Sequence, residues 1–231
     1  IESARTLKEN GNIKDFQLFA SIDSIGKQAE YIRHGLDYDY FIHNVERYLT
    51  EVPHSSISFI VTFSLMSMPG FSALIETFLE LRKKFNKDFQ RIHFDTPRLT
   101  APRFFSLNIL TDDFQDQLRG QIEHLKKYRT QSDTDLNGLS DAEIAKIERI
   151  HKWMGESIDT KALLGLRTDF YLFCKEHDKR RGTNFRRTFR ELTGFMDFCE
   201  KEATRYWDLH PDEAWGYRSG ILHRTEGPSL D

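Results

Sequence analysis

Cysteine is scarce in this chain, since Cys174 and Cys199 are the only two among 231 residues. Two thiols exclude a disulfide framework and favour a reducing, cytoplasmic compartment. The nine histidines form no H-E-x-x-H or H-x-x-x-H arrangement, which argues against a zinc site. No apolar run approaches the roughly 18 to 20 residues of a membrane span, and no signal-peptide pattern opens the chain. We therefore expect no membrane partner and no metal site built by this chain alone.

An excess of charge of either sign is also missing. Lys and Arg number 33 against 36 Asp and Glu, which gives a net charge of −3. This balance makes nucleic acid an improbable partner. The hydrophobic share of 39% and the charged share of 30% are ordinary for a folded globular protein.

The chain begins with Ile1, and residues 2–10 are rich in helix formers without an N-cap before them. Gly11 follows as a natural helix stop. A chain that opens within a helix predicts that this sequence is a piece of a longer protein.

Three apolar segments rich in β-branched and aromatic residues predict strands at 14–23, 56–65 and 89–96. Helical periodicity fills the intervals between them. One of the predicted helices has Asp37 as N-cap and ends at Pro53. This alternation is typical of βα units that form a parallel sheet.

Beyond Thr111 the pattern becomes helical, with an S-x-x-E capping box at Ser140 and Glu143. Further helices are expected at about 160–178 and 188–205, and the last 20 residues are expected to be an irregular tail. The fold class is thus α/β, with a parallel region at 1–110 and an all-helical region at 111–231.

Short polar side chains follow each predicted strand: Ser21 and Asp23, then Thr62 and Ser64, then Asp95 and Thr96. The carboxyl ends of parallel strands meet at one edge of a sheet, where α/β proteins bind their ligands. These residues are therefore candidate ligand-binding residues. The alternative is that they cap the helices that follow, as Ser, Thr and Asp often do.

Residues 21–49 contain three elements in order. Ser21 and Asp23 belong to the pattern S-[IL]-D-[GS], Arg33 and Gly35 to the pattern R-x-G, and Asn44 lies at the centre of a predicted helix. This pattern resembles the fourth strand and helix of radical-SAM enzymes of the SPASM/Twitch group. Three later segments are similar to the fifth strand and helix, the sixth strand and the distal Twitch region of that group: 56–85, 92–99 and 176–192. The resemblance covers about residues 1–200.

The resemblance implies that residues 1–110 are the C-terminal half of a partial, six-stranded (βα) barrel. Such barrels bind S-adenosylmethionine beside a [4Fe-4S] cluster, and a 5′-deoxyadenosyl radical abstracts hydrogen from the substrate, here a peptide or a small molecule. Ser21 and Asp23 would then contact the ribose, and Arg33 the cofactor carboxylate. The other implied contacts are Thr62 and Ser64 at the cavity edge, with Asp95 and Thr96 at its mouth near the adenine or substrate. For Arg33 the alternative is a surface ion pair with Glu30 or Asp37.

The C-x-x-x-C-x-x-C loop that holds the cluster in this family is absent, as is the glycine-rich segment after the second strand. Both belong to the N-terminal half of the barrel, which we expect to precede Ile1. That half would be the partner with which residues 1–110 complete the barrel. The chain alone is therefore predicted to be inactive. Cys174 and Cys199 are too few for an auxiliary cluster and are expected to be buried packing residues.

A second hypothesis is a non-catalytic α/β module that binds a partner through the basic helical segment 179–190. This segment carries six cations: Lys179, Arg180, Arg181, Arg186, Arg187 and Arg190. The simpler interpretation is a solvated surface on which Glu176, Asp178 and Glu191 balance the positive charge.

Overall fold

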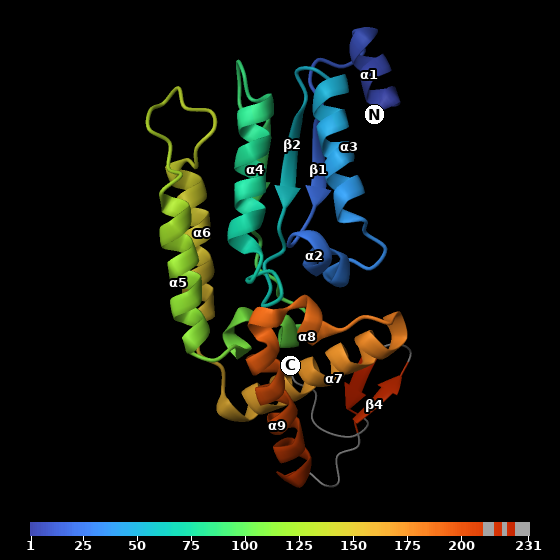
Figure 1. Ribbon diagram of the computed structural model, residues 1–231, viewed down its shortest axis with the longest axis vertical. Helices are drawn as coiled ribbons and strands as arrows, with labels where there is room; N and C mark the ends of the chain where they lie inside the picture. Colours follow the sequence, from blue (N-terminus) through green and yellow to red (C-terminus); the bar gives the residue numbers. More distant parts are fainter. Residues whose placement is uncertain (210–214, 219–220, 225–231) are drawn as a thin grey trace.

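The computed structural model describes residues 1–209, 215–218 and 221–224. A three-stranded parallel sheet stands at the centre, and most of the other elements are helices (Figure 1). In the sheet region the elements are α1 (Glu2–Glu9), β1 (Gln17–Ser21), α2 (Gly26–Ile32), α3 (Tyr38–Glu51), β2 (Ser56–Ile60), α4 (Phe71–Phe85) and β3 (Ile92–Asp95). In the helical region they are η1 (Arg103–Phe105), η2 (Leu107–Ile109), α5 (Asp113–Lys126), α6 (Asp141–Met154), α7 (Thr160–Arg181), α8 (Phe185–Thr188), η3 (Arg190–Leu192), α9 (Thr193–Leu209), β4 (Trp215–Arg218) and β5 (Ile221–Arg224).

The sheet has the order β1-β2-β3, with both pairs parallel, as the alternation of strand and helix patterns predicts. In the register, Ala20 lies beside Phe59 and Phe59 beside Phe94. The strands are shorter than the apolar segments, although backbone hydrogen bonds continue the parallel pairing past the strand ends, as between Phe63 and Pro97. The α/β class predicted from the sequence is therefore confirmed.

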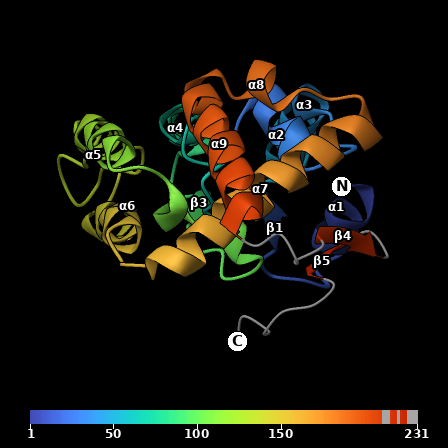
Figure 2. The ribbon, with the colours of Figure 1, turned by 90° about the horizontal axis from the view of Figure 1, so that it is seen from below.

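The helices that connect the strands lie on one face of the sheet, which Phe59 of β2 shows directly. Its buried ring stacks on Phe78 of α4 at 4.2 Å and lies 6.4 Å from Phe41 of α3. Both helices therefore pack on the side toward which Phe59 points, and Figure 2 shows them on the same side of the strands. The opposite face is less covered, since Phe19, the neighbour of Ser58 in the register, is 64% exposed.

A buried ion pair connects the helical region to the sheet region. Arg82 of α4 is completely buried, and its guanidinium donates to both carboxylate oxygens of Glu143 in α6. The same guanidinium donates to the carbonyls of Ile92 and Gly138. Glu143 also accepts from the Ser140 amide, so the predicted capping box is confirmed and shares its carboxylate with the ion pair.

Arg91, just before β3, closes the C-terminal end of α3. Its guanidinium donates to the carbonyls of Leu49, Val52 and Ser55 at distances of 2.7 to 3.1 Å. The carbonyls at the end of a helix lack partners within the helix and attract a cation. Burial lowers the pKa of Arg91, and the nearby Tyr48 offsets this effect only in part.

Arg91→Lys should lower the free energy of unfolding by about 1 kcal/mol, because a lysine keeps the charge but cannot reach three carbonyls with a planar fork. Urea unfolding followed by circular dichroism measures the change. Arg47→Lys on α3 is the control, since Arg47 forms an exposed pair with Glu51 and should change stability by less than about 0.5 kcal/mol. Equal effects of the two substitutions would contradict this role for Arg91.

Beyond residue 110 the helices largely follow the predictions. The stripe of Phe114, Leu118, Ile122 and Leu125 is buried along α5, and Cys174 and Cys199 are both buried, as expected. The helix expected at 188–205 corresponds to the last residue of α8, then η3 and α9, because the backbone of Phe189 is not helical.

The region 111–231 is not all-helical, which corrects the sequence prediction. Strands β4 and β5 pair antiparallel within the segment expected to be an irregular tail, with Trp215 opposite Arg224. The alternation in WGYR and ILHR is short and lies beside several polar residues, which conceals the strand signal. The remaining residues of the expected tail, Pro228 among them, lie outside the described part. Within the described part, no helix is long and apolar enough to cross a membrane.

Candidate functional site

The sheet places its polar strand ends against the helical region, and a pocket of about 380 Å³ lies between them. Its walls come from the segments after β1 and β2, the end of α2, the loop 97–105 and α7. We call it the strand-end pocket. Its lining residues are Asp23, Tyr31, Ile32, Arg33, Thr62, Ser64, Met66, Leu99, Pro102, Phe105, Phe173, His177 and Arg181.

Asp23 joins the ends of β1 and β2 at the pocket wall. Its Oδ1 accepts from the backbone amide of Thr62 at 2.9 Å, and its Oδ2 lies 2.8 Å from Arg33 Nε. Only 5% of Asp23 is exposed. Burial raises the pKa of its carboxyl above the ordinary value, although Arg33 and the Thr62 amide act in the opposite direction. The pocket wall therefore contains the buried carboxylate of Asp23 beside the half-exposed side chain of Arg33.

The segment after β2 is held in place by its own hydroxyl groups. The Ser64 amide donates to Ser67 Oγ, which in turn donates to the Thr62 carbonyl at 3.3 Å. Gly70, just before α4, lies so close to the segment after β1 that a Cβ there would stand 2.3 Å from Ser24 Oγ. The N-terminus of α4 can approach the segment after β1 this closely because position 70 has no side chain.

Four of the seven residues predicted from the strand ends and from Arg33 line the pocket together: Asp23, Arg33, Thr62 and Ser64. The alternative that Asp23 caps the following helix does not apply, because α2 has Ile25 at its N-cap and no side-chain cap. Arg33 pairs with Asp23 and not with Glu30 or Asp37; Glu30 pairs with Lys27 at 2.6 Å.

The other three predicted residues do not line this pocket. Ser21 is the last residue of β1 and is exposed. Asp95, at the end of β3, is exposed and forms an ion pair with Lys146 of α6 at 3.1 Å. Thr96 is buried, and its hydroxyl has no hydrogen-bond partner within the described residues. The end of β3 is therefore turned toward α6.

Helix α7 supplies a pocket wall that the strand pattern could not predict. Phe173, His177 and Arg181 follow one another at intervals of four residues, so they lie on one helix face. The His177 ring packs against Tyr31 of α2 with centroids 4.3 Å apart and the ring planes tilted by 35°. The sequence signal for this helix face is the i, i+4, i+8 spacing of an aromatic, an imidazole and a guanidinium. The spacing does not reveal which other element packs against that face.

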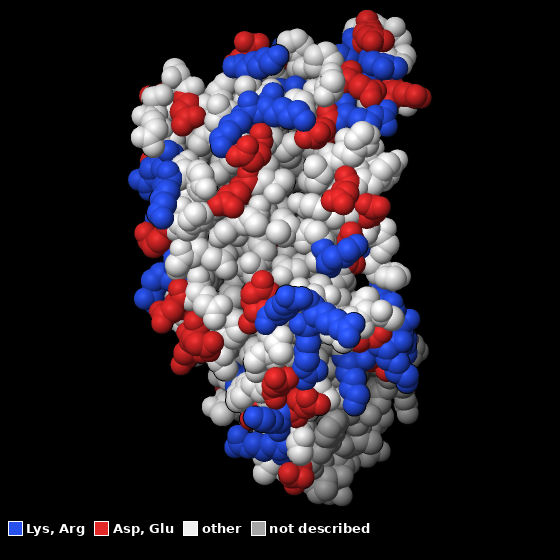
Figure 3. All heavy atoms as spheres, viewed as in Figure 1, with Lys and Arg blue, Asp and Glu red and all other residues white. Residues whose placement is uncertain are grey.

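The basic segment 179–190 is partly neutralised. Arg180 pairs with Glu176, and Arg186 pairs with Asp197 and Glu200. Arg180, and to a smaller extent Lys179, lowers the pKa of the Glu176 carboxyl. Figure 3 shows Lys and Arg gathered over α8 and the adjoining end of α7, with acidic residues among them.

Among the described residues, no group of three or more His, Cys, Asp or Glu side chains is placed to hold a metal ion. The cysteines do not contribute to the pocket, and burial raises the pKa of both thiols. No protein-family model, curated protein or solved structure matches this chain.

Proposed function

We propose that this chain is the C-terminal portion of a radical S-adenosylmethionine enzyme and that the strand-end pocket binds part of that cofactor. The observation that carries the proposal is the convergence of Asp23, Arg33, Thr62 and Ser64 in one pocket at the carboxyl edge of a parallel sheet. Ligands of parallel α/β folds bind at this edge.

The pocket offers the groups that S-adenosylmethionine requires. Asp23 is a buried acceptor for ribose hydroxyls, and Arg33 is a cation for a carboxylate. Leu99, Pro102 and Phe105 form an apolar wall suited to a purine ring. When bound next to a reduced cluster, the cofactor would supply a radical for hydrogen abstraction, while this chain binds and orients it.

The residues present do not suit the iron–sulfur cluster, because the described part has only two cysteines and brings no three ligand-type side chains together. The cluster would have to be held by other polypeptide. We therefore assign to this chain only the ribose and carboxylate side of the cofactor site.

The sheet supports a further part of the proposal, that β1 to β3 form an arc of a partial (βα) barrel. All three strands are parallel and in chain order, and α3 and α4 cover one face. A parallel sheet normally has both faces and its edges covered. The less covered face, with Phe19 exposed, would then be the barrel interior.

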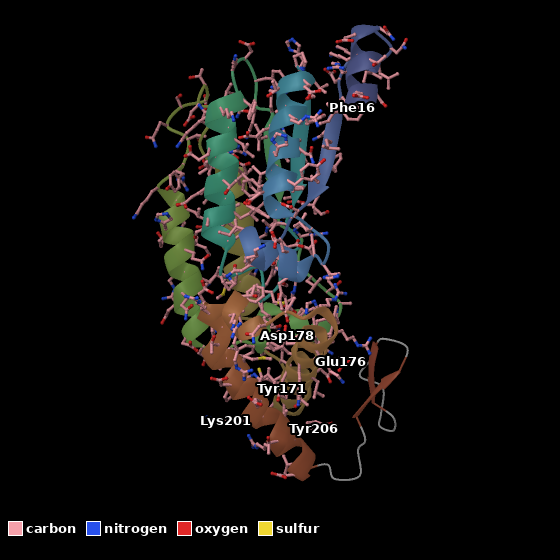
Figure 4. All side chains as sticks on the ribbon, turned by 45° about the vertical axis from the view of Figure 1, so that its right-hand side comes forward. Phe16, Tyr171, Glu176, Asp178, Lys201 and Tyr206 are labelled. Carbon is pink, nitrogen blue, oxygen red and sulfur yellow. The ribbon has the colours of Figure 1, made fainter. Side chains whose placement is uncertain are left out.

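A groove beside β1 is where the next strand and helix of the proposed arc would pack. It has a volume of about 720 Å³, and the start of α1 contributes to its lining. Its apolar wall comes from β1, the residue before it and α3: Phe16, Leu18, Ala20, Phe41, Val45 and Tyr48. The outer edge of β1 pairs with no other described strand. Figure 4 shows Phe16 at the α1 end of this edge, beside the strand.

The test uses the complete reading frame that contains this chain, purified without oxygen and reduced with dithionite. We expect a C-x-x-x-C-x-x-C motif upstream, the absorption of a [4Fe-4S] cluster and formation of 5′-deoxyadenosine from S-adenosylmethionine. Replacing the three motif cysteines with alanine is the control and should abolish both signals. A reading frame that begins at this chain, or a cluster protein that forms no 5′-deoxyadenosine, would overturn the proposal.

A further inference from the structure

The far wall of the strand-end pocket carries a histidine whose hydrogen bonds fix its protonation pattern. His177 Nδ1 lies 3.2 Å from Thr183 Oγ1, and Thr183 Oγ1 lies 2.8 Å from Asp178 Oδ1. The second carboxylate oxygen of Asp178 accepts from the Phe185 amide at 2.8 Å. Figure 4 shows Asp178 on the part of the helical region that approaches the strand ends.

The direction of these hydrogen bonds follows from the groups involved. A carboxylate only accepts, so the single proton of the Thr183 hydroxyl is donated to Asp178. Thr183 Oγ1 must then accept from His177, which places the imidazole proton on Nδ1. Nε2 keeps its lone pair, and no hydrogen-bond partner for Nε2 occurs within the described residues.

We propose that His177 takes up and returns a proton at Nε2 for a ligand bound in the strand-end pocket, and that Thr183 and Asp178 hold its imidazole in the Nδ1–H form. This role goes beyond binding of the cofactor. It requires a ligand with an acidic O–H, N–H or C–H group beside an anionic group, because the Arg181 guanidinium stands four residues along the same helix face.

The proposed step balances without another reactant. The X–H bond of the ligand breaks, its electron pair stays on X, and an N–H bond forms at Nε2. The resulting imidazolium is stabilised through Thr183 by Asp178, and the negative charge on X by Arg181. Return of the proton to X, or its loss to water, restores the neutral ring.

The surroundings of His177 favour a neutral ring that is ready to accept. Burial lowers its pKa below the ordinary value of 6.5, and the nearby Arg181 acts in the same direction. His34, after α2, also opposes protonation, whereas Asp178 favours it. From α2, the uncharged phenol of Tyr31 packs against the ring. A base of this kind is unprotonated at neutral pH yet can hold a proton while a ligand reacts.

The test on the purified chain examines both the tautomer and the accessibility of Nε2. Nitrogen-15 NMR of the histidine rings should show His177 with a protonated Nδ1 and an unprotonated Nε2, the signals being assigned by their loss in His177→Gln. Thr183→Ser keeps the hydroxyl and should preserve this pattern. Thr183→Val removes the hydroxyl and should move the proton toward Nε2.

Diethyl pyrocarbonate, which acylates unprotonated imidazole nitrogens, provides the second readout. At pH 6, mass spectrometry should show His177 modified, and its rate should fall several-fold in Thr183→Val but not in Thr183→Ser. His43, which is exposed on α3, is the internal control and should react alike in all three proteins.

A protonated Nε2 in the unmodified chain would overturn this role, as would a His177 that stays unmodified while His43 reacts. Equal results for Thr183→Ser and Thr183→Val would also overturn it, because a merely structural contact at position 183 does not distinguish serine from valine. Neither readout needs the cofactor. A failure to bind S-adenosylmethionine and a failure of the His177 role can therefore be told apart.

Discussion

Glu143→Ala should lower the free energy of unfolding by about 3–5 kcal/mol, the largest effect we expect of any single substitution in this chain. The guanidinium of Arg82 is completely buried, and Glu143 is its only carboxylate partner among the described residues. Removal of Glu143 leaves an uncompensated cation in the core and also breaks the capping box of α6. Urea unfolding followed by circular dichroism measures the loss.

Glu80→Ala is the matched control for this prediction. Glu80 and Lys83 form an exposed pair on the same helix as Arg82, and such pairs contribute about 0.3–0.5 kcal/mol. Adding Arg82→Met to Glu143→Ala should recover part of the loss, because the buried charge is then removed as well. A loss below about 1 kcal/mol for Glu143→Ala would show that Arg82 is hydrated in the folded protein.

The capping box was predictable because its signal is local. Ser140 and Glu143 stand three residues apart, and the motif needs only one turn of helix to form. The ion pair with Arg82 was not predictable, because 61 residues separate the partners. Helical spacing places Arg82, four residues after Phe78, on the apolar face of α4, whereas Lys83 and Lys84 are exposed. The spacing does not say which carboxylate Arg82 would contact.

The strand ends show the same division between local and tertiary information. Apolar runs followed by polar residues correctly predicted three parallel strands, and the topology of a parallel sheet then brings Asp23 and Thr62 to one edge. Asp95 also lies at that edge, but Lys146 of α6 holds it outside the pocket. Sequence periodicity does not report how a later helix packs, so it assigned Asp95 to the pocket and did not include His177.

Asp23→Ala, in the complete protein, should weaken binding of S-adenosylmethionine by about 1–3 kcal/mol, the contribution of a hydrogen bond to a charged group. The substitution removes the carboxylate proposed to contact the ribose, and Arg33 loses its ion-pair partner. Isothermal titration calorimetry with S-adenosylmethionine measures the change in affinity.

The carboxylate of Asp23 also holds the Thr62 amide, so a weaker affinity could reflect a loosened strand end. Asp23→Asn separates the two effects, because an amide oxygen can still accept from Thr62 while the charge beside Arg33 is gone. If binding depends on the charge, Asn should weaken binding nearly as much as Ala while leaving the unfolding transition closer to that of the unmodified protein.

Asp95→Asn is the matched control, because Asp95 ends the adjacent strand but lies outside the pocket. It should leave the affinity for S-adenosylmethionine unchanged. If Asp23→Ala binds the cofactor as tightly as the unmodified protein, Asp23 serves only to join the ends of β1 and β2. If Asp95→Asn loses binding and Asp23→Ala does not, the cofactor binds outside the strand-end pocket. Its site would then be the less covered face of the sheet, where Asp95 and Phe19 are exposed.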